Sequence, residues 1–259
     1  MMNWSRGFLA QLGRFGLLSK EVLASLLHSG IRWRAVSSQI VAIGIGSQLV
    51  VIVTGAFTGA VFAAQAYFKF KELGLGSATG PVVSIAMCRE LGPVLAALMV
   101  AGRMGSAMAA EIGTMRVTQQ VDALRSFGVD PVDYLVVPKF LAILVSMPVL
   151  VAEAIWLGMI AAEFLTVEMF GVPRPWFDAQ LVAHTRVDDV ATGLIKGTIF
   201  GVIIVIVSCA RGIHAKDGAV GVGQATTRAV VDSSLAILVV NFFLSLLLNY
   251  WLPTSSIDL

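Results

Sequence analysis

The feature that decides the fold is an uncharged run at residues 35–68, AVSSQIVAIGIGSQLVVIVTGAFTGAVFAAQAYF. A helix needs about 20 apolar residues to cross the roughly 30 Å of hydrocarbon in a bilayer. The run therefore predicts a membrane-spanning helix over residues 40–66. Working outward with the same criterion predicts four more spans, over residues 81–110, 140–167, 190–210 and 233–252.

Composition points to the same class of protein. Of the 259 residues, 57% are hydrophobic and 13% are charged, whereas a soluble domain has about 25% charged residues. This excludes an ordinary soluble globule, a disordered chain and a nucleic-acid binder built on a basic stripe. Cys88 and Cys209 lie in apolar segments and the histidines are scattered, so the sequence predicts no disulfide framework, no metal site and no cofactor. We expect one all-α integral membrane domain over residues 1–259.

The distribution of basic residues predicts how the chain is oriented. With the N-terminus inside, the cytoplasmic segments hold eleven Lys and Arg residues and the external segments hold five, while Arg89 and Arg103 lie within the second span. Cytoplasmic segments carry the excess of Lys and Arg. We therefore expect the N-terminus in the cytoplasm and the C-terminus, with the tail Pro253–Leu259, on the external side.

The first 38 residues predict an amphipathic helix that lies in the membrane surface. They lack the short apolar core and cleavage site of a signal peptide, and Phe8, Leu12 and Phe15 instead interleave with Arg6 and Arg14. Such a pattern suits an interfacial helix. Packing of this helix on the spans is an equally good interpretation and is compatible with the first.

Small residues recur at helical spacing in the first two spans. Gly55 and Gly59 form a GxxxG motif, and Ala101 and Gly105 belong to a ridge of small residues in the second span. Such ridges let helix backbones approach closely in lipid. Packing between helices and a dimer seam are both open interpretations.

Two adjacent charges, Arg89 and Glu90, lie inside the second span. Ionisable groups at membrane depth are costly and usually face a partner or a cavity, and Pro93 predicts a bend next to them because it removes a helical hydrogen bond. A role in a lipid path and structural pairing, of Arg89 with Glu153 or another helix, are both open. Lys196 lies near one end of the fourth span, where it could extend to the interface.

An apolar wall with an aromatic rim is predicted at the external end of the first span. Phe62 and Phe70 fall on one helical face there, and such a wall near a charge suits a phospholipid. The alternative is that these aromatic residues only anchor the span at the interface.

The connection after the second span predicts a short amphipathic helix over residues 114–127. Val117, Val121, Leu124 and Phe127 share its apolar face. This face could lie on the bilayer or insert into a groove of a soluble partner. The other cytoplasmic connection, residues 218–228, is glycine-rich but lacks the GxxxxGK[ST] pattern of a phosphate loop, so we expect a flexible turn there and no ATP site in this chain.

Two longer motifs carry a family resemblance. RELGPVLAALMVAGRMGSAMAAEIGTMRVTQQVDALRSFGVDP, residues 89–131, closely resembles the MlaE/YrbE permeases of ABC-type lipid transporters, and GVGQATTRAVVDSS, residues 221–234, is similar to a second signature of that family. The resemblance extends over most of the chain from about residue 40. One departure is that Gln119 or Gln120 stands where the family commonly has a glutamate.

The resemblance implies an inner-membrane permease that is not itself an enzyme. It implies a homodimer whose protomers have an interfacial N-terminal helix and five spans, a separate cytoplasmic ABC ATPase that hydrolyses ATP, a periplasmic MCE-domain protein and sometimes a STAS-domain protein. It also implies transport of phospholipid between the inner and outer membranes, which maintains outer-membrane lipid asymmetry. The segment 114–127 corresponds to the coupling helix that docks on the ATPase, and Arg89–Glu90 to a position near the lipid cavity.

Two other classes of function are weighed against this one. An ion-coupled secondary transporter could use Glu90 or Glu153 as its proton carrier, but such folds usually have more spans and an internal repeat. An intramembrane lipid-modifying enzyme needs a nucleophile–base pair or a metal cluster at depth, which the sequence does not offer.

Overall fold

The computed structural model describes residues 2–28, 30–74 and 78–251, and every regular element in this described part is helical. Five helical segments are long and apolar enough to cross a membrane. The prediction of an all-α integral membrane protein is confirmed. The tail Pro253–Leu259 lies outside the described residues.

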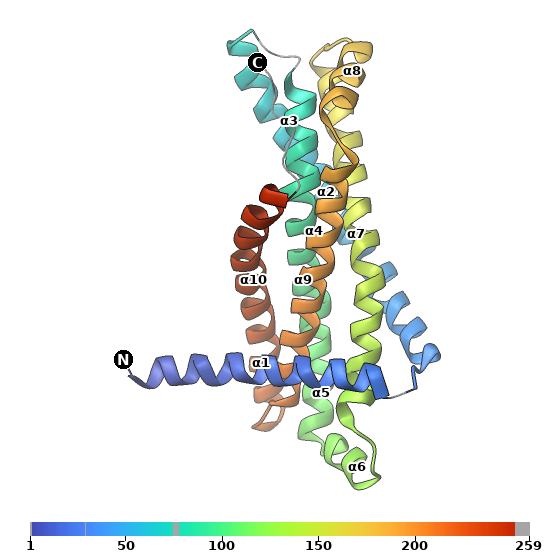
Figure 1. Cartoon of the computed structure of the whole chain (residues 1–259), viewed down its shortest axis with the longest axis vertical. Helices are drawn as coiled ribbons and strands as arrows, with labels where there is room; N and C mark the ends of the chain where they lie inside the picture. The colour runs from blue at the N-terminus through green and yellow to red at the C-terminus, as the bar shows by residue number, and fades with distance from the viewer. Residues whose placement is uncertain (1, 29, 75–77, 252–259) are drawn as a thin grey trace. The chain divides into compact units, whose positions relative to one another are not determined.

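The helices follow one another with short connections (Figure 1). The N-terminal helix is α1 (Met2–His28) and the first span is α2 (Trp33–Glu72). The second span comprises α3 (Thr79–Ala86), η2 (Met87–Leu91), α4 (Gly92–Val100), η3 (Ala101–Gly105) and α5 (Ser106–Val117). After α6 (Gln120–Ser126), the third span comprises η4 (Val132–Val136), α7 (Val137–Phe164) and η5 (Leu165–Met169); α8 (Arg174–His184), α9 (Val187–Ile213) and α10 (Gly218–Trp251) complete the chain.

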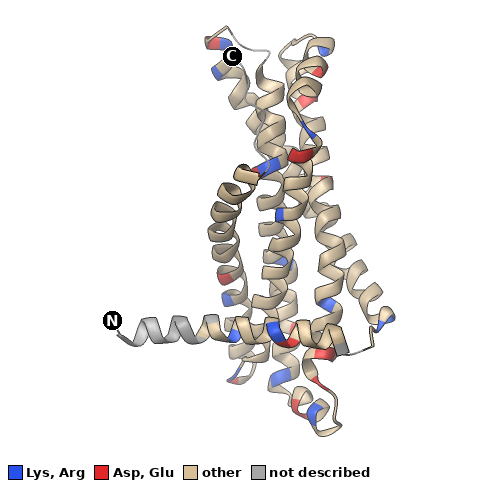
Figure 2. Cartoon of the chain, viewed as in Figure 1, with Lys and Arg blue, Asp and Glu red and all other residues tan. Residues whose placement is uncertain are grey.

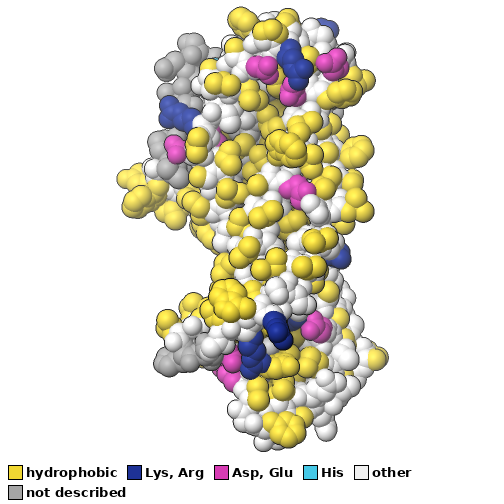
Figure 3. Space-filling model, turned by 90° about the vertical axis from the view of Figure 1, so that its right-hand side faces the viewer, with side chains coloured by type: hydrophobic (Ala, Val, Ile, Leu, Met, Phe, Trp, Pro, Cys, Tyr) yellow, Lys and Arg dark blue, Asp and Glu magenta, His cyan; other side chains and the backbone are white. Residues whose placement is uncertain are grey.

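Charged residues are sparse along these long helices (Figure 2), and apolar side chains are spread widely over the face shown in Figure 3. Large hydrophobic side chains are exposed on several spans; Phe57 is 70% exposed, Trp156 65% and Phe243 63%. Exposed apolar patches of this extent mark contact with lipid or with another protein in the membrane. The surface is that of a multi-pass membrane protein.

The helices that form the spans are longer than the apolar runs that predicted them. The glycine-rich segment 218–228 also has a different secondary structure from the one predicted. The expected flexible turn is wrong, because this segment forms the first turns of α10. The chain reverses just before it, where Asp217 and Gly218 have φ angles of 63° and 64°. Gly221 fits because a Cβ there would overlap the carbonyl of Lys216.

The described chain divides into two compact units, to both of which several of the long helices contribute. Unit 1 comprises residues 1–46, 100–146 and 201–236, and unit 2 comprises residues 47–99, 147–200 and 237–259.

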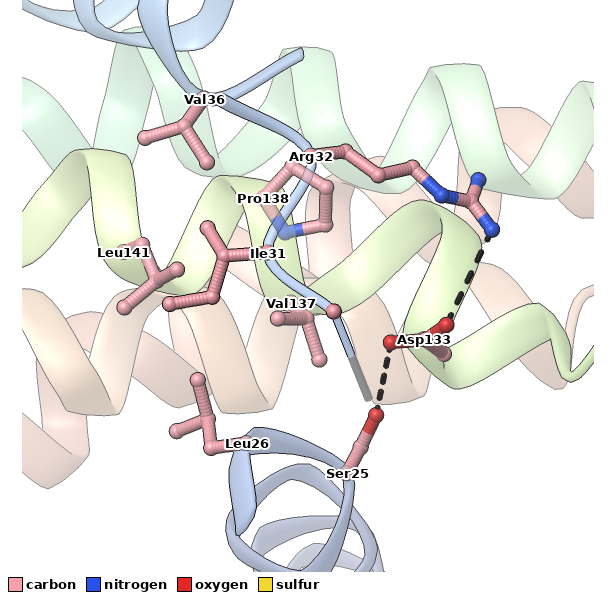
Figure 4. Close-up of a pocket in the computed structure, with 10 residues that line it drawn as sticks. Ser25, Leu26, Ile31, Arg32, Val36, Asp133, Val137, Pro138 and Leu141 are labelled. Atoms are coloured by element: carbon pink, nitrogen blue, oxygen red, sulfur yellow. Dashed lines mark hydrogen bonds and ion pairs between the residues drawn. The ribbon is translucent and has the colours of Figure 1, made fainter. Parts of the chain in front are cut away.

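Within unit 1, α1 runs crosswise to the other helices of the unit (Figure 1). Polar contacts hold its end, as Figure 4 shows: Ser25 Oγ donates to Asp133 Oδ1 at 2.9 Å, and Arg32 lies 3.8 Å from Asp133 Oδ2. Arg32 also stacks over the ring of Tyr134 at 4.5 Å. A helix that crosses the bundle instead of joining it has the geometry expected of an interfacial helix.

Glycines bring two helices of unit 2 into backbone contact. A Cβ at Gly55 would lie 2.7 Å from the carbonyl oxygen of Ala154, and one at Gly59 would overlap the backbone of Gly158. The GxxxG motif of α2 therefore packs on α7 of the same chain. In unit 1, Ala101 is fully buried, and a Cβ at Gly105 would lie 2.9 Å from Ser208 Oγ on α9. All four small residues therefore take part in helix packing within the chain.

Candidate functional site

The site begins with a local distortion of the second span. Met87–Leu91 forms a π-helical turn, and Pro93 follows two residues after its end. Proline has no N–H, so the carbonyl of Arg89 lacks its α-helical donor. Lys196 Nζ, on α9, donates a 2.9 Å hydrogen bond to that carbonyl. The bend expected from Pro93 is thus a π turn that frees a backbone acceptor.

Arg89 is held by α9 and α10. Its Nε donates to Asp189 Oδ1 at 2.5 Å and its Nη1 to Asn249 Oδ1 at 3.3 Å. The Asp189 side chain also accepts the backbone N–H of Arg186 at 2.8 Å, so it caps the start of α9 as well as pairing with Arg89. Glu153, the partner considered from sequence, instead accepts a 3.0 Å bond from Gln48.

Glu90 accepts three hydrogen bonds from the same two helices. Lys196 Nζ donates at 2.7 Å, Ser245 Oγ at 2.8 Å and Asn241 Nδ2 at 3.0 Å. The side chain of Lys196 is only 1% exposed. The expectation that Lys196 extends to the interface is therefore wrong, because a carboxylate and a free carbonyl within the membrane satisfy its ammonium.

The four charges balance. Arg89 pairs with Asp189 and Lys196 pairs with Glu90, so the network is neutral as a whole. Each unpaired charge in a span costs about 2.5–3.5 kcal/mol on insertion scales, which explains why both cations have carboxylate partners. Glu90 differs from the others because its side chain is 43% exposed, whereas those of Arg89 and Asp189 are 9% and 3% exposed.

A cavity of about 660 Å³ in unit 2 opens on this network. This volume is typical of a pocket that holds a small molecule or part of a larger one. Its polar lining residues are Arg89, Glu90, Thr192, Lys196, Ser245 and Asn249, and its apolar ones are Val82, Ile85, Ala86, Leu246 and Leu248. The combination offers polar partners and apolar surface to one ligand.

The aromatic residues predicted to join Arg89 and Glu90 lie elsewhere. Neither Phe62 nor Phe70 lines the cavity. Phe62 is half-buried and packs on a small core formed by Ala63, Val83, Met87 and Ala162, and Phe70 is half-buried near the end of α2. Only the two charged members of the predicted lipid path are brought together.

A surface ion pair joins the beginning of α8 to the third span. Arg174 Nη2 donates to Glu163 Oε1 at 2.6 Å. This bond to the Glu163 carboxylate raises the pKa of Arg174, so the arginine stays charged at any physiological pH.

The segment 114–127 is two helices and not one. α5 ends at Val117 and α6 begins at Gln120, because Gln119 adopts a left-handed conformation with φ 61°. Because of this break, the residues of the expected apolar face differ in exposure. Val121 is fully buried in unit 1, whereas Phe127 is 83% exposed. Val117 and Leu124 are half-buried. Val121 therefore belongs to the core, and Phe127 is the most exposed residue of the predicted docking face.

The sequence reasoning missed most of the partners in the cavity. Asp189 and Lys196 were visible only as separate charges at the start of the fourth span. A clearer signal lay in the last span, where Asn241, Ser245 and Asn249 recur every four residues in an otherwise apolar helix. Residues at this spacing share one helical face, and here that face meets Arg89 and Glu90.

The model of the family described as Permease MlaE matches residues 36–247. The chain belongs to the MlaE permease family. The matched residues include both motifs on which the resemblance was based, and they include the four charged residues Arg89, Glu90, Asp189 and Lys196. The predicted family membership is confirmed.

Relatives of this MlaE-family permease match along most of its length. It is 41% identical over 234 residues to the "Probable ABC transporter permease protein" of Rickettsia bellii, a match that covers 90% of each chain. It is 40% identical over 231 residues to a Synechocystis protein of the same description, over 89% of this chain and 88% of that one. It is 37% identical over 229 residues to the chloroplastic protein TRIGALACTOSYLDIACYLGLYCEROL 1 of Arabidopsis thaliana, over 88% of this chain and 65% of that protein.

Proposed function

We propose that this permease is the membrane-spanning subunit of an ABC transporter, and that a separate cytoplasmic subunit hydrolyses the ATP. Its bacterial relatives, which are described as probable ABC transporter permeases, support the first part. The absence of a phosphate-loop motif from the sequence supports the second. In this proposal α6 transmits movement from the ATPase to the spans, as bistable helix contacts do in other switching proteins.

The proposed substrate is a phospholipid that is moved between the inner and outer membranes, which would maintain outer-membrane lipid asymmetry. The transporter would be an inner-membrane homodimer whose protomers have a cytoplasmic N-terminus and a periplasmic C-terminus. A periplasmic MCE-domain protein, and in some systems a STAS-domain protein, would complete it. The single observation that carries the substrate class is the cavity of about 660 Å³, which combines a charged network with apolar lining residues inside a membrane protein.

Within this cavity Glu90 is the charged group that a lipid head group would meet. Its carboxylate is the most exposed of the four charged side chains, while Val82, Ile85 and Leu246 offer surface to acyl chains. Apolar lining with a few placed polar groups is the usual construction of a site for an amphipathic ligand.

Glu90→Gln is expected to slow lipid transport by more than it lowers stability, although it leaves the buried Lys196 ammonium without a carboxylate partner. Glutamine has nearly the same shape, and its carbonyl oxygen can still accept from Lys196. We expect transport in proteoliposomes with the ATPase to fall about tenfold or more, equivalent to about 1.4 kcal/mol. The amount of purified dimer and the thermal unfolding of the variant are measured together with its transport.

The matched control is Glu153→Gln, which removes a carboxylate that does not line the cavity. Equal transport by the two variants would contradict the role of Glu90. Transport that continues without the ATPase and depends on a proton gradient would instead favour the ion-coupled alternative.

Phe127→Asp is expected to weaken binding of the ATPase. The side chain is 83% exposed, so the change leaves the core of unit 1 intact, but an aspartate in a protein groove would be buried without a partner. Loss of an aromatic anchor costs about 2 kcal/mol or more, so we expect about 30-fold weaker association. The fraction of ATPase that co-purifies with the permease at increasing dilution in detergent measures this association.

Val182→Asp provides the control, because Val182 on α8 is 77% exposed and lies outside the predicted docking segment. Val121→Asp is unsuitable, since it would place a charge in the core. Unchanged ATPase co-purification with the Phe127 variant would show that α6 does not dock through this residue.

A further inference from the structure

Unit 1 contains two cavities that have two lining residues in common, Arg14 of α1 and His214 at the end of α9. The first, about 210 Å³, is also lined by Arg211, Lys216 and Arg228. The second, about 230 Å³, is lined by Glu21 and Arg125, which carry opposite charges, and by six apolar residues: Leu17, Leu18, Pro131, Val132, Ala210 and Ile213. A basic cavity therefore adjoins a mostly apolar one, and neither shares a residue with the cavity of unit 2.

The basic cavity carries an excess of positive charge. Arg211 forms an ion pair with Asp232, which also accepts a 3.0 Å bond from Gln11 of α1. Within residues 2–28, 30–74 and 78–251, no ion pair is formed by Arg14, Lys216 or Arg228. Among the described residues that line this cavity, Asp217 carries the single carboxylate, so Arg14, Lys216 and Arg228 face one anion there.

The position of these residues indicates which class of anionic ligand fits the two cavities. Lys216 lies in the connection between two membrane-spanning helices, and Arg14 lies on the crosswise helix α1 (Figure 1). Basic pockets between spans at the membrane surface bind anionic lipid head groups. A free phosphate ion would need only the basic cavity, whereas a phospholipid also needs apolar surface for its chains. Leu17, which is 63% exposed, and Leu18 provide such surface beside Arg14.

We propose that this pair of cavities binds one anionic phospholipid, with its phosphate among Arg14, Lys216 and Arg228 and an acyl chain along Leu17, Leu18 and Ile213. The lipid joins α1 to the connection between α9 and α10. It is a bound ligand of unit 1 and not the transported substrate. This goes beyond the proposed function, since it holds for any cargo of the cavity in unit 2.

Site-specific photo-crosslinking locates the lipid. A photoreactive amino acid is placed at Gln224, which lines the basic cavity, or at Thr227, which is exposed on the same helix but lines neither cavity. The full-length permease is reconstituted in vesicles of phosphatidylcholine and phosphatidylglycerol and irradiated. We expect phosphatidylglycerol adducts at Gln224 in clear excess over Thr227, and excess inorganic phosphate should not remove them.

Charge neutralisation measures the affinity. Each basic residue near a membrane surface contributes about fivefold to binding of anionic lipid, so K216Q with R228Q should weaken phosphatidylglycerol binding about 25-fold by native mass spectrometry. The matched control is K20Q with R34Q, which removes two exposed cations that do not line either cavity. Its binding should stay within about twofold of the wild type, since general surface attraction is not site-specific.

Three results would overturn the proposal: equal adducts at Gln224 and Thr227, displacement by inorganic phosphate, or crosslinking of Gln224 to a protein partner in place of lipid. A fourth measurement separates it from the transport proposal. E90Q alters the cavity of unit 2 and should leave the Gln224 adduct unchanged, and loss of that adduct in E90Q would assign the lipid to the transport cavity.

Discussion

Replacing Arg89 with methionine should destabilise the permease by about 3–5 kcal/mol, because it leaves Asp189 charged and buried without its partner. The side chain of Asp189 is 3% exposed, and among the described residues its other hydrogen bond comes from the backbone N–H of Arg186. The free energy of unfolding in mixed detergent micelles measures the loss. We expect the amount of folded protein to fall with it, so reduced transport by this variant reflects lost fold.

A double-mutant cycle isolates the ion pair. Arg89→Met combined with Asp189→Asn removes both charges, while the asparagine side chain can still accept the N–H of Arg186. The double variant should recover most of the stability lost by Arg89→Met alone, with a coupling energy of about 1–3 kcal/mol. Purely additive losses would show that the 2.5 Å contact between Arg89 and Asp189 contributes little.

Gly59→Leu should have the second large effect, a loss of about 3 kcal/mol or more, because no side chain fits against the backbone of Gly158. Overpacking of a close contact costs about 1–3 kcal/mol and sometimes more. Gly102→Leu is the control, since a Cβ at Gly102 meets nothing within 4 Å. Thermal unfolding of the two variants in the same detergent makes the comparison.

The two glycine variants also test the helix assignment. Leucine is a better helix former than glycine by nearly 1 kcal/mol, so propensity alone would stabilise both variants. A Gly59→Leu protein as stable as Gly102→Leu would mean that α2 and α7 are not in backbone contact.

The helices were predictable because the signals for spans are local. A run such as residues 35–68 cannot be stable outside a membrane or a core, and its length gives the span directly. The ends were less predictable: α10 begins at Gly218, well before the predicted residue 233. Three glycines in its first turns argue for a turn by propensity, but close packing on Lys216 requires the glycine at 221.

The candidate site was predictable in part, and the missing part is tertiary. Arg89 and Glu90 were identifiable because charges are rare in spans. Their partners were not, since the pairs join residues about 100 positions apart, and nothing local distinguishes Lys196 held by Glu90 from Lys196 extending to the interface. Val121 shows the same limit. The spacing of Val121 placed it on the predicted docking face. In the structure it is buried in the core, because the left-handed conformation of Gln119 changes the direction of the chain just before it.

The contacts of the second span with the fourth and fifth spans also have a consequence for synthesis, because the paired residues are translated at different times. Arg89 and Asp189 are 100 residues apart in the chain, and ribosomes synthesise about 5–20 residues per second. The second span therefore emerges roughly 5–20 s before Asp189 has been translated, and Asn249 follows later still. During that interval both charges enter the membrane without their final partners. The insertion machinery must hold this helix beside water or protein, and release it to lipid only when α9 and α10 have arrived.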